Sequence, residues 1–144
     1  QKYEIDPNIT VIEEDTASAE KLSIPNADNS THGLEGIART VSFDAFYDPK
    51  SILNDGRLTS VAMVLNYLEP LNQPGSTLPA LSSIQFLTFD CPASNYRLTR
   101  YVMHDKANGR GTMISDTGEI MPVPEWKPVP ENSVNKALYM RVCN

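Results

Sequence analysis

The clearest candidates for chemistry in the sequence are basic side chains that crowd into a short stretch of its second half. Four basic residues fall within fourteen positions, and two tyrosines lie among them. This group consists of Arg97, Arg100, Lys106 and Arg110, with Tyr96 and Tyr101. Basic groups bind acidic protein segments or polyanionic glycans with an affinity that falls as salt rises, and tyrosine rings add flat contact area. We therefore predict a shallow binding surface here; the alternative is a set of ordinary solvated charges.

The strand that carries this group decides which of its members lie together. Side chains alternate between the two faces of a strand, so Arg97 and Arg100 point to opposite faces unless a bulge intervenes. The sharper prediction is therefore a basic surface made of Arg100, Lys106 and Arg110, with the tyrosines at its edge.

Catalytic and metal chemistry find little support in the residues. His32 and His104 have no second ligand at the spacing that a metal site requires, so we interpret both as solvated surface histidines. No nucleophile motif is present, and the glycines on either side of Arg110 lack the lysine of a phosphate-binding loop. Asp48 opens a turn and Asp90 adjoins a cysteine, which assigns both carboxylates to structure. The sequence thus predicts no enzyme, no metal site and no cofactor.

Length and composition indicate one domain. The 144 residues, 40% of them hydrophobic, suffice for one sizeable core, and no apolar run is long enough to span a membrane. The net charge of −6 argues against a nucleic-acid partner. Residues 1–72 hold twelve acids and five bases, a balance of −7, whereas residues 73–144 hold six acids and seven bases, a balance of +1. An anionic partner would therefore meet the second half of the chain.

The two cysteines, Cys91 and Cys143, predict a disulfide between distant parts of the chain. On the chain-entropy model, closing a loop of about fifty residues stabilises a fold by roughly 4 kcal/mol. The alternative is a pair of buried free thiols. A disulfide would indicate an exported protein; a leader removed before Gln1 and a trimmed start fit the sequence equally well.

Alternating apolar residues and turn signals predict an antiparallel sheet. The expected strands are residues 41–48, 57–69, 84–91, 96–104 and 110–115. The pattern of 57–69 also fits a helix, but the Asp-Gly turn before it and the Glu-Pro stop after it favour a strand. The segment 70–83 contains three prolines and a glycine, and we predict a loop there.

The end of the chain changes to helical periodicity. Apolar side chains and one arginine form a single helical stripe made of Val134, Ala137, Leu138, Arg141 and Val142. Ser133 is a suitable N-cap, and Pro128 and Pro130 prevent earlier residues from joining the helix. Trp126 is expected to cover the edge of the core. The disulfide would then tie the last helical turn to the sheet.

The first part of the chain is polar, acidic and rich in turn formers. We predict an arm over residues 1–39, with one edge strand within residues 3–12, followed by a domain over residues 40–144. The predicted fold class is α+β: a four- to six-stranded antiparallel sheet with a C-terminal helix packed on it and one disulfide.

The order of these segments resembles the surface-adhesin protein E family of Gram-negative bacteria. The resemblance covers about residues 43–143. It rests on Asp48-Pro49 with Ser51, Phe89-Asp90-Cys91 with Tyr96-Arg97, and Trp126 with Ser133 to Cys143. It implies an antiparallel sheet with a helix on it, the same disulfide, and export to the periplasm or the outer-membrane surface. For the founding adhesins it also implies binding of host matrix and plasma proteins, and homodimers.

The predicted function is that of an exported, non-catalytic, adhesin-like protein that binds host matrix or plasma proteins or another protein surface. Two other functions stay open. One is a periplasmic inhibitor or immunity-type protein whose loop at residues 71–83 blocks a bacterial enzyme. The other is a structural envelope protein that associates with itself. Enzyme activity retained in its presence would count against the first, and a monomeric mass in solution against the second.

Overall fold

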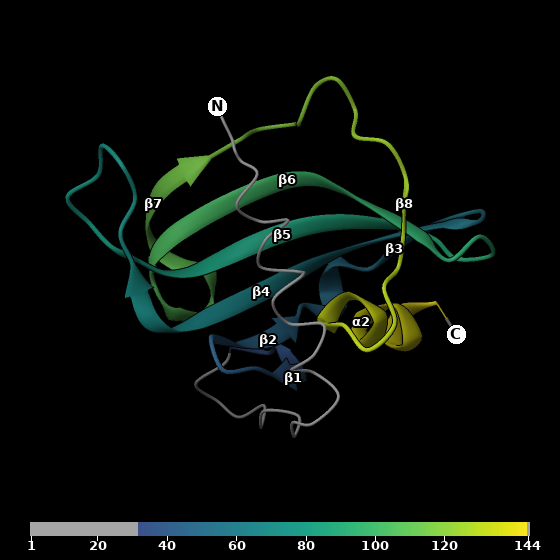
Figure 1. The fold of residues 1–144 in the computed structure, drawn as a ribbon, viewed down its shortest axis with the longest axis horizontal. Coiled ribbons are helices and arrows are strands. Elements are labelled where there is room, and N and C mark those ends of the chain that lie inside the picture. Colours follow the sequence, from purple (N-terminus) through teal and green to yellow (C-terminus); the bar gives the residue numbers. More distant parts are fainter. Residues whose placement is uncertain (1–31, 144) are drawn as a thin grey trace.

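The computed structural model describes residues 32–143, which form one large antiparallel sheet with a helix on one face (Figure 1). The strands are β1 (Glu35–Arg39), β2 (Phe43–Tyr47), β3 (Leu53–Asp55), β4 (Leu58–Leu71), β5 (Ala80–Asp90), β6 (Asn95–Lys106), β7 (Arg110–Asp116) and β8 (Lys127–Pro128), and the helix is α2 (Val134–Val142). The strand order is β1-β2-β4-β5-β6-β7, with β3 paired to β4 and β8 to β6. Short 3-10 turns lie at Pro49–Ser51 and Ala107–Gly109.

The sheet has more strands than the sequence predicts. The five expected strands correspond to β2, β4, β5, β6 and β7, and the C-terminal helix is α2. With β1, β3 and β8 the described residues form eight strands, so the predicted number of four to six is too low. β3 and β8 are too short to show an alternating pattern. In β1 a register shift between Gly36 and Ala38 breaks the alternation.

β1 lies within the segment that the sequence assigns to a polar arm. Its Ile37 and Ala38 are each only 4% exposed and belong to the main core. The folded domain therefore includes residues before the predicted boundary at residue 40. The predicted edge strand at 3–12 lies outside the described residues.

The predicted loop at 70–83 is shorter in the structure, because β4 and β5 extend into it from both sides. Ser82 and Ser83 belong to β5 and have no exposed surface. Their hydroxyl oxygens are hydrogen-bonded, since the Tyr67 hydroxyl donates to Ser83 Oγ at 2.8 Å and the Gly109 N–H donates to Ser82 Oγ at 2.9 Å. Small polar residues that are typical of a loop are here satisfied core residues.

The two faces of the sheet differ in how much apolar surface they bury. We call the face against which α2 packs the helix face (Figure 1). Its core consists of Ile37, Ala38, Phe43, Ala45, Tyr47, Val61, Met63, Leu65, Leu87, Phe89, Tyr96, Val129, Val134 and Leu138. The opposite, outer face carries a small cluster made of Leu34, Phe46 and Val64 with Ile84. Because hydrophobic stabilisation scales with buried apolar area, the helix face supplies most of it.

The disulfide joins Cys91 and Cys143, with a Cα–Cα distance of 5.5 Å, and confirms the predicted pairing. Cys91 directly follows β5, and Cys143 is the C-cap of α2. At the other end of the helix, Ser133 Oγ accepts the N–H of Lys136 at 3.0 Å, as expected for an N-cap. Both ends of α2 are therefore fixed.

Candidate binding surface

A bulge in β6 places two of the predicted binding residues on one face. Successive residues of β5 stand opposite Leu98 and Arg100, so Thr99 is an extra residue in β6. Arg97 and Arg100 consequently stand opposite alternate residues of β5, and both lie on the outer face. The sequence predicts opposite faces for these two residues unless a bulge intervenes, and the bulge is present. No feature of the sequence marks its position.

The tip of the β6–β7 hairpin folds back over the outer face. Asn66 of β4 and Asn108 of the tip bind each other twice: Asn66 Nδ2 donates to Asn108 Oδ1 at 2.8 Å, and the Asn108 N–H donates to Asn66 Oδ1 at 2.7 Å. The next N–H, of Gly109, binds Ser82 Oγ. Asn108 has a φ of 66°, in the left-handed region that asparagine tolerates better than most residues. These bonds give the tip a fixed position.

Lys106 and Arg110 flank this tip and stand directly opposite each other in the β6–β7 ladder. Both are exposed, and neither forms an ion pair with another residue that the structure describes. Like charges that face each other across an antiparallel pair destabilise the sheet. The nearby Asp105 accepts the N–H of Thr112 through Oδ1 at 2.6 Å and forms no ion pair with either cation. Lys106 and Arg110 therefore face each other without an ion-pair partner among the described residues.

Arg100 is not a free cation. Its Nε and Nη2 donate to the two carboxylate oxygens of Asp116, at 3.0 and 2.6 Å. This hydrogen bonding lowers the pKa of Asp116 below its ordinary value, an effect that burial opposes and the Gly118 N–H reinforces. The same contact raises the pKa of Arg100. The ion pair neutralises the positive charge of Arg100, which the sequence assigns to the predicted basic surface.

Replacing Asp116 with Asn is expected to destabilise the protein at neutral pH and to matter less in acid. The lowered pKa of Asp116 means that its contribution is full above the ordinary carboxyl pKa, near ~4, and is lost as the pH falls through the lowered folded value. Urea unfolding of wild type and variant between about pH 7 and pH 2 measures this difference. Asp55→Asn removes an exposed carboxylate as a control. A difference for Asp116→Asn that stays constant across the range would contradict the assignment.

Arg97 and Trp126 form a stack at the far end of β6. The Arg97 guanidinium carbon lies 4.0 Å from the centroid of the Trp126 ring, within the range of a cation–π contact. Trp126 belongs to the segment that leads into β8, which pairs with the first residues of β6. The ring covers Arg97 and is not among the side chains that pack against the main core, which differs from the prediction that Trp126 covers the edge of the core.

The two tyrosines of the predicted surface lie on the helix face. Tyr96 is 6% exposed and packs in the core beside Phe89, with ring centroids 6.3 Å apart. The hydroxyl of Tyr101 lies 3.3 Å from that of Tyr67. The six predicted binding residues thus do not form one patch, and only Lys106 and Arg110 remain as neighbouring, unpaired cations.

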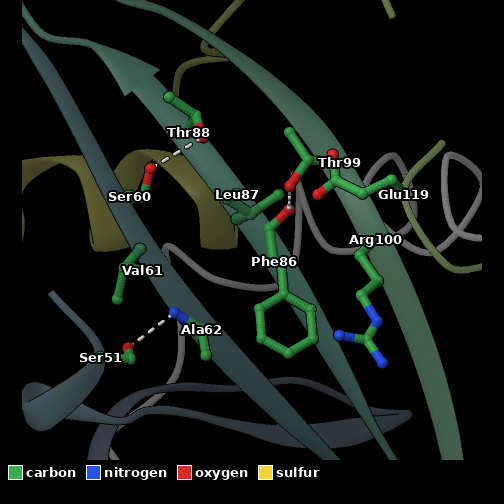
Figure 2. Close-up of a pocket in the computed structure, with 10 residues that line it drawn as sticks. All are labelled: Ser51, Ser60, Val61, Ala62, Phe86, Leu87, Thr88, Thr99, Arg100 and Glu119. Atoms are coloured by element: carbon green, nitrogen blue, oxygen red, sulfur yellow. Dashed lines mark hydrogen bonds between the residues drawn. The ribbon is translucent and has the colours of Figure 1, made fainter. Parts of the chain in front are cut away.

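A pocket of about 240 Å³ lies on the outer face, and the sequence gives no sign of it (Figure 2). Its floor comes from β4, β5 and β6, and includes the Phe86 ring and the side chain of Arg100. Ser51 of the first 3-10 turn lines one side, and Glu119, which follows β7, lines another. These residues are far apart in the sequence, so only the folded sheet brings them together.

Comparison with known proteins identifies the family. Residues 35–144 match the family described as surface-adhesin protein E, which is more than half of the chain. The chain belongs to the surface-adhesin protein E family. This confirms the resemblance predicted from the sequence. No curated protein sequence matches the chain.

Solved structures of protein E from Haemophilus influenzae are similar to this chain. A crystal form II structure has a TM-score of 0.64 and 17% identity, and the match covers 85% of this chain and 94% of that chain. A second structure has a TM-score of 0.63 and 17% identity, covering 85% and 90%. Protein E from the non-typeable bacterium has a TM-score of 0.61 and 19% identity, covering 85% and 81%. At these identities the likeness shows the fold.

Family membership supports an exported, adhesin-like surface protein and suggests a non-enzymatic role. Over residues 32–143, α2 and the short turns offer no helix with the length and apolarity needed to cross a membrane. The described part of the chain also contains no cluster of three potential metal ligands among His, Cys, Asp and Glu.

Proposed function

We propose that this member of the surface-adhesin protein E family is a non-catalytic binding protein that holds acidic segments of host matrix or plasma proteins, at the outer-membrane surface or in the periplasm. The observation that carries the proposal is that Lys106 and Arg110 face each other without an ion-pair partner among the described residues. The pair is exposed, its two members repel each other, and the hairpin tip between them is fixed to the sheet. A carboxylate from a partner would relieve this repulsion.

The position of the pair favours binding by the hairpin tip rather than by the whole basic stretch. Arg100 is held by Asp116, and Arg97 is stacked on Trp126, so neither guanidinium is as available as the tip cations. A preorganised tip also loses little conformational entropy on binding, which improves affinity. Because the contacts are exposed and ionic, affinity should fall as salt rises.

Binding to immobilised vitronectin and laminin at low and physiological salt tests the proposal. We expect saturable binding that weakens by about tenfold in the double variant Lys106→Gln with Arg110→Gln, because exposed charges govern such contacts. The control, Lys50→Gln with Lys127→Gln, removes the same charge from exposed positions outside the tip. Equal losses in both double variants would show a general charge effect, and no binding by the folded wild type would overturn the proposal for these partners.

A further inference from the structure

The volume and the lining residues of the pocket on the outer face indicate what kind of ligand it can bind. We propose that it binds the side chain of a lysine or arginine presented by a protein partner. The inference rests on the proposed function only in taking the partner to be a protein. The pocket volume of about 240 Å³ lies below the range of about 300–1,000 Å³ that is usual for whole small-molecule ligands. A single long side chain fits this space better than a cofactor.

The hydroxyl groups of the pocket have already used most of their hydrogens. Ser51 Oγ donates to the carbonyl of Asp48 at 2.7 Å, and Thr99 Oγ1 donates to the carbonyl of Phe86 at 3.1 Å. Ser60 Oγ and Thr88 Oγ1 lie 3.0 Å apart, so one of them donates to the other (Figure 2). Ser51 Oγ already accepts the N–H of Ala62 at 2.8 Å, but a hydroxyl oxygen has two lone pairs, so each of these oxygens can accept a further hydrogen bond. Three of the four hydroxyl hydrogens are used, so the lining offers mainly hydrogen-bond acceptors and suits a ligand that donates.

The charges of the pocket point to the same conclusion. Arg100 is its only cation, and two of its nitrogens are bound to Asp116. The Glu119 carboxylate is exposed and forms no ion pair with a residue within 32–143. Asp116 lies outside the lining but offsets the charge of Arg100, so Glu119 gives the pocket together with this ion pair a negative balance. An ammonium or guanidinium group carries only donors and a positive charge, and it matches this lining.

The Phe86 ring completes the match. It is only partly buried and lies among the lining side chains of the pocket, beside the guanidinium of Arg100 (Figure 2). The Arg100 guanidinium carbon is 5.4 Å from the Phe86 ring centroid. Arg100 already provides the cation for this ring, so the ring's role toward a ligand is to pack against the methylene stem of a lysine or arginine. An anionic ligand would meet the like charge of Glu119, and two of the five N–H donors of Arg100 are already bound to Asp116.

The test is an NMR titration with the peptide acetyl-Gly-Lys-Gly-amide. Its counterpart with acetyl-lysine keeps the stem but lacks the charge. We expect the lysine peptide to shift the backbone amide signals of Phe86, Thr99 and Glu119, and the acetyl-lysine peptide to leave them unchanged. Glu119→Gln should raise the dissociation constant about fivefold, as for the loss of an exposed ion pair. Glu125→Gln removes an exposed carboxylate of the same segment outside the pocket and should leave it unchanged.

The possible outcomes test the inference about the pocket independently of the proposed function of the hairpin tip. Shifts at the pocket amides that need Glu119 support the inference even if vitronectin and laminin do not bind. Equal effects of the two glutamate variants, equal shifts with the acetyl-lysine peptide, or no shifts at all would overturn it. In that case salt-sensitive binding through Lys106 and Arg110 would leave the proposed function in place.

Discussion

Removing the disulfide through Cys91→Ala with Cys143→Ala is expected to lower the free energy of unfolding by roughly 4 kcal/mol, the chain-entropy value for a closed loop of this length. The bond links residues 52 positions apart and ties the C-cap of α2 to the end of β5. Without it, the unfolded chain gains freedom and the last turn of α2 loses its covalent anchor. Urea unfolding of the oxidised wild type and the double variant measures the loss.

The reduced wild type provides the matched control for this prediction. A reducing agent should bring the wild-type midpoint close to that of the double variant and leave the variant itself unchanged. Because small domains are typically stable by only about 5–15 kcal/mol, the expected loss is a large share of the total. Coincident midpoints for the oxidised wild type and the double variant would contradict the structural role of the bond.

Replacing Phe89 with Ala is expected to destabilise the protein by about 3–5 kcal/mol, the usual loss for a fully buried phenylalanine. Phe89 has no exposed surface and lies at the centre of the helix-face core. Its ring contacts those of Tyr96 and Tyr139, with centroids 6.3 and 5.8 Å away. The substitution would remove the contact that joins β5, β6 and α2.

Phe86→Ala is the control, because Phe86 lies on the same strand but on the outer face and is only partly buried. Thermal or urea unfolding should show a clearly smaller loss for Phe86→Ala than for Phe89→Ala. Similar losses would contradict the assignment of the main core to the helix face. The same variant can also be used to test ligand binding in the pocket, because it removes the Phe86 ring from the lining without removing a side chain of the main core.

Much of the fold can be predicted from local patterns. The alternation in β5, the Asn108-Gly109 turn and the helical stripe from Val134 all depend on neighbours within a few positions, and the structure confirms them. The arm boundary and the loop at 70–83 differ from the prediction for a common reason. β1 carries a bulge, and Ser82 and Ser83 are polar, so neither segment shows the apolar alternation that marks a strand.

The candidate site depends on features that a single sequence does not display. The extra residue Thr99 in β6 decides on which face Arg100 lies, and bulges leave little local signal. The pairing of Arg100 with Asp116 joins residues sixteen positions apart through the β6–β7 hairpin. Composition shows how many charges a segment has, but only the register shows which of them neutralise each other. The pocket beside Glu119 leaves no mark in the sequence for the same reason, since its lining residues come together only in the folded sheet.

The most direct test of the binding account is amide hydrogen exchange of the protein, alone and saturated with the host protein that it binds most tightly. The account predicts slower exchange in the β6–β7 hairpin around Lys106 and Arg110, and unchanged exchange in α2. Protection confined to α2 and the helix face would contradict it, because the partner would then bind the face that the structure assigns to the core.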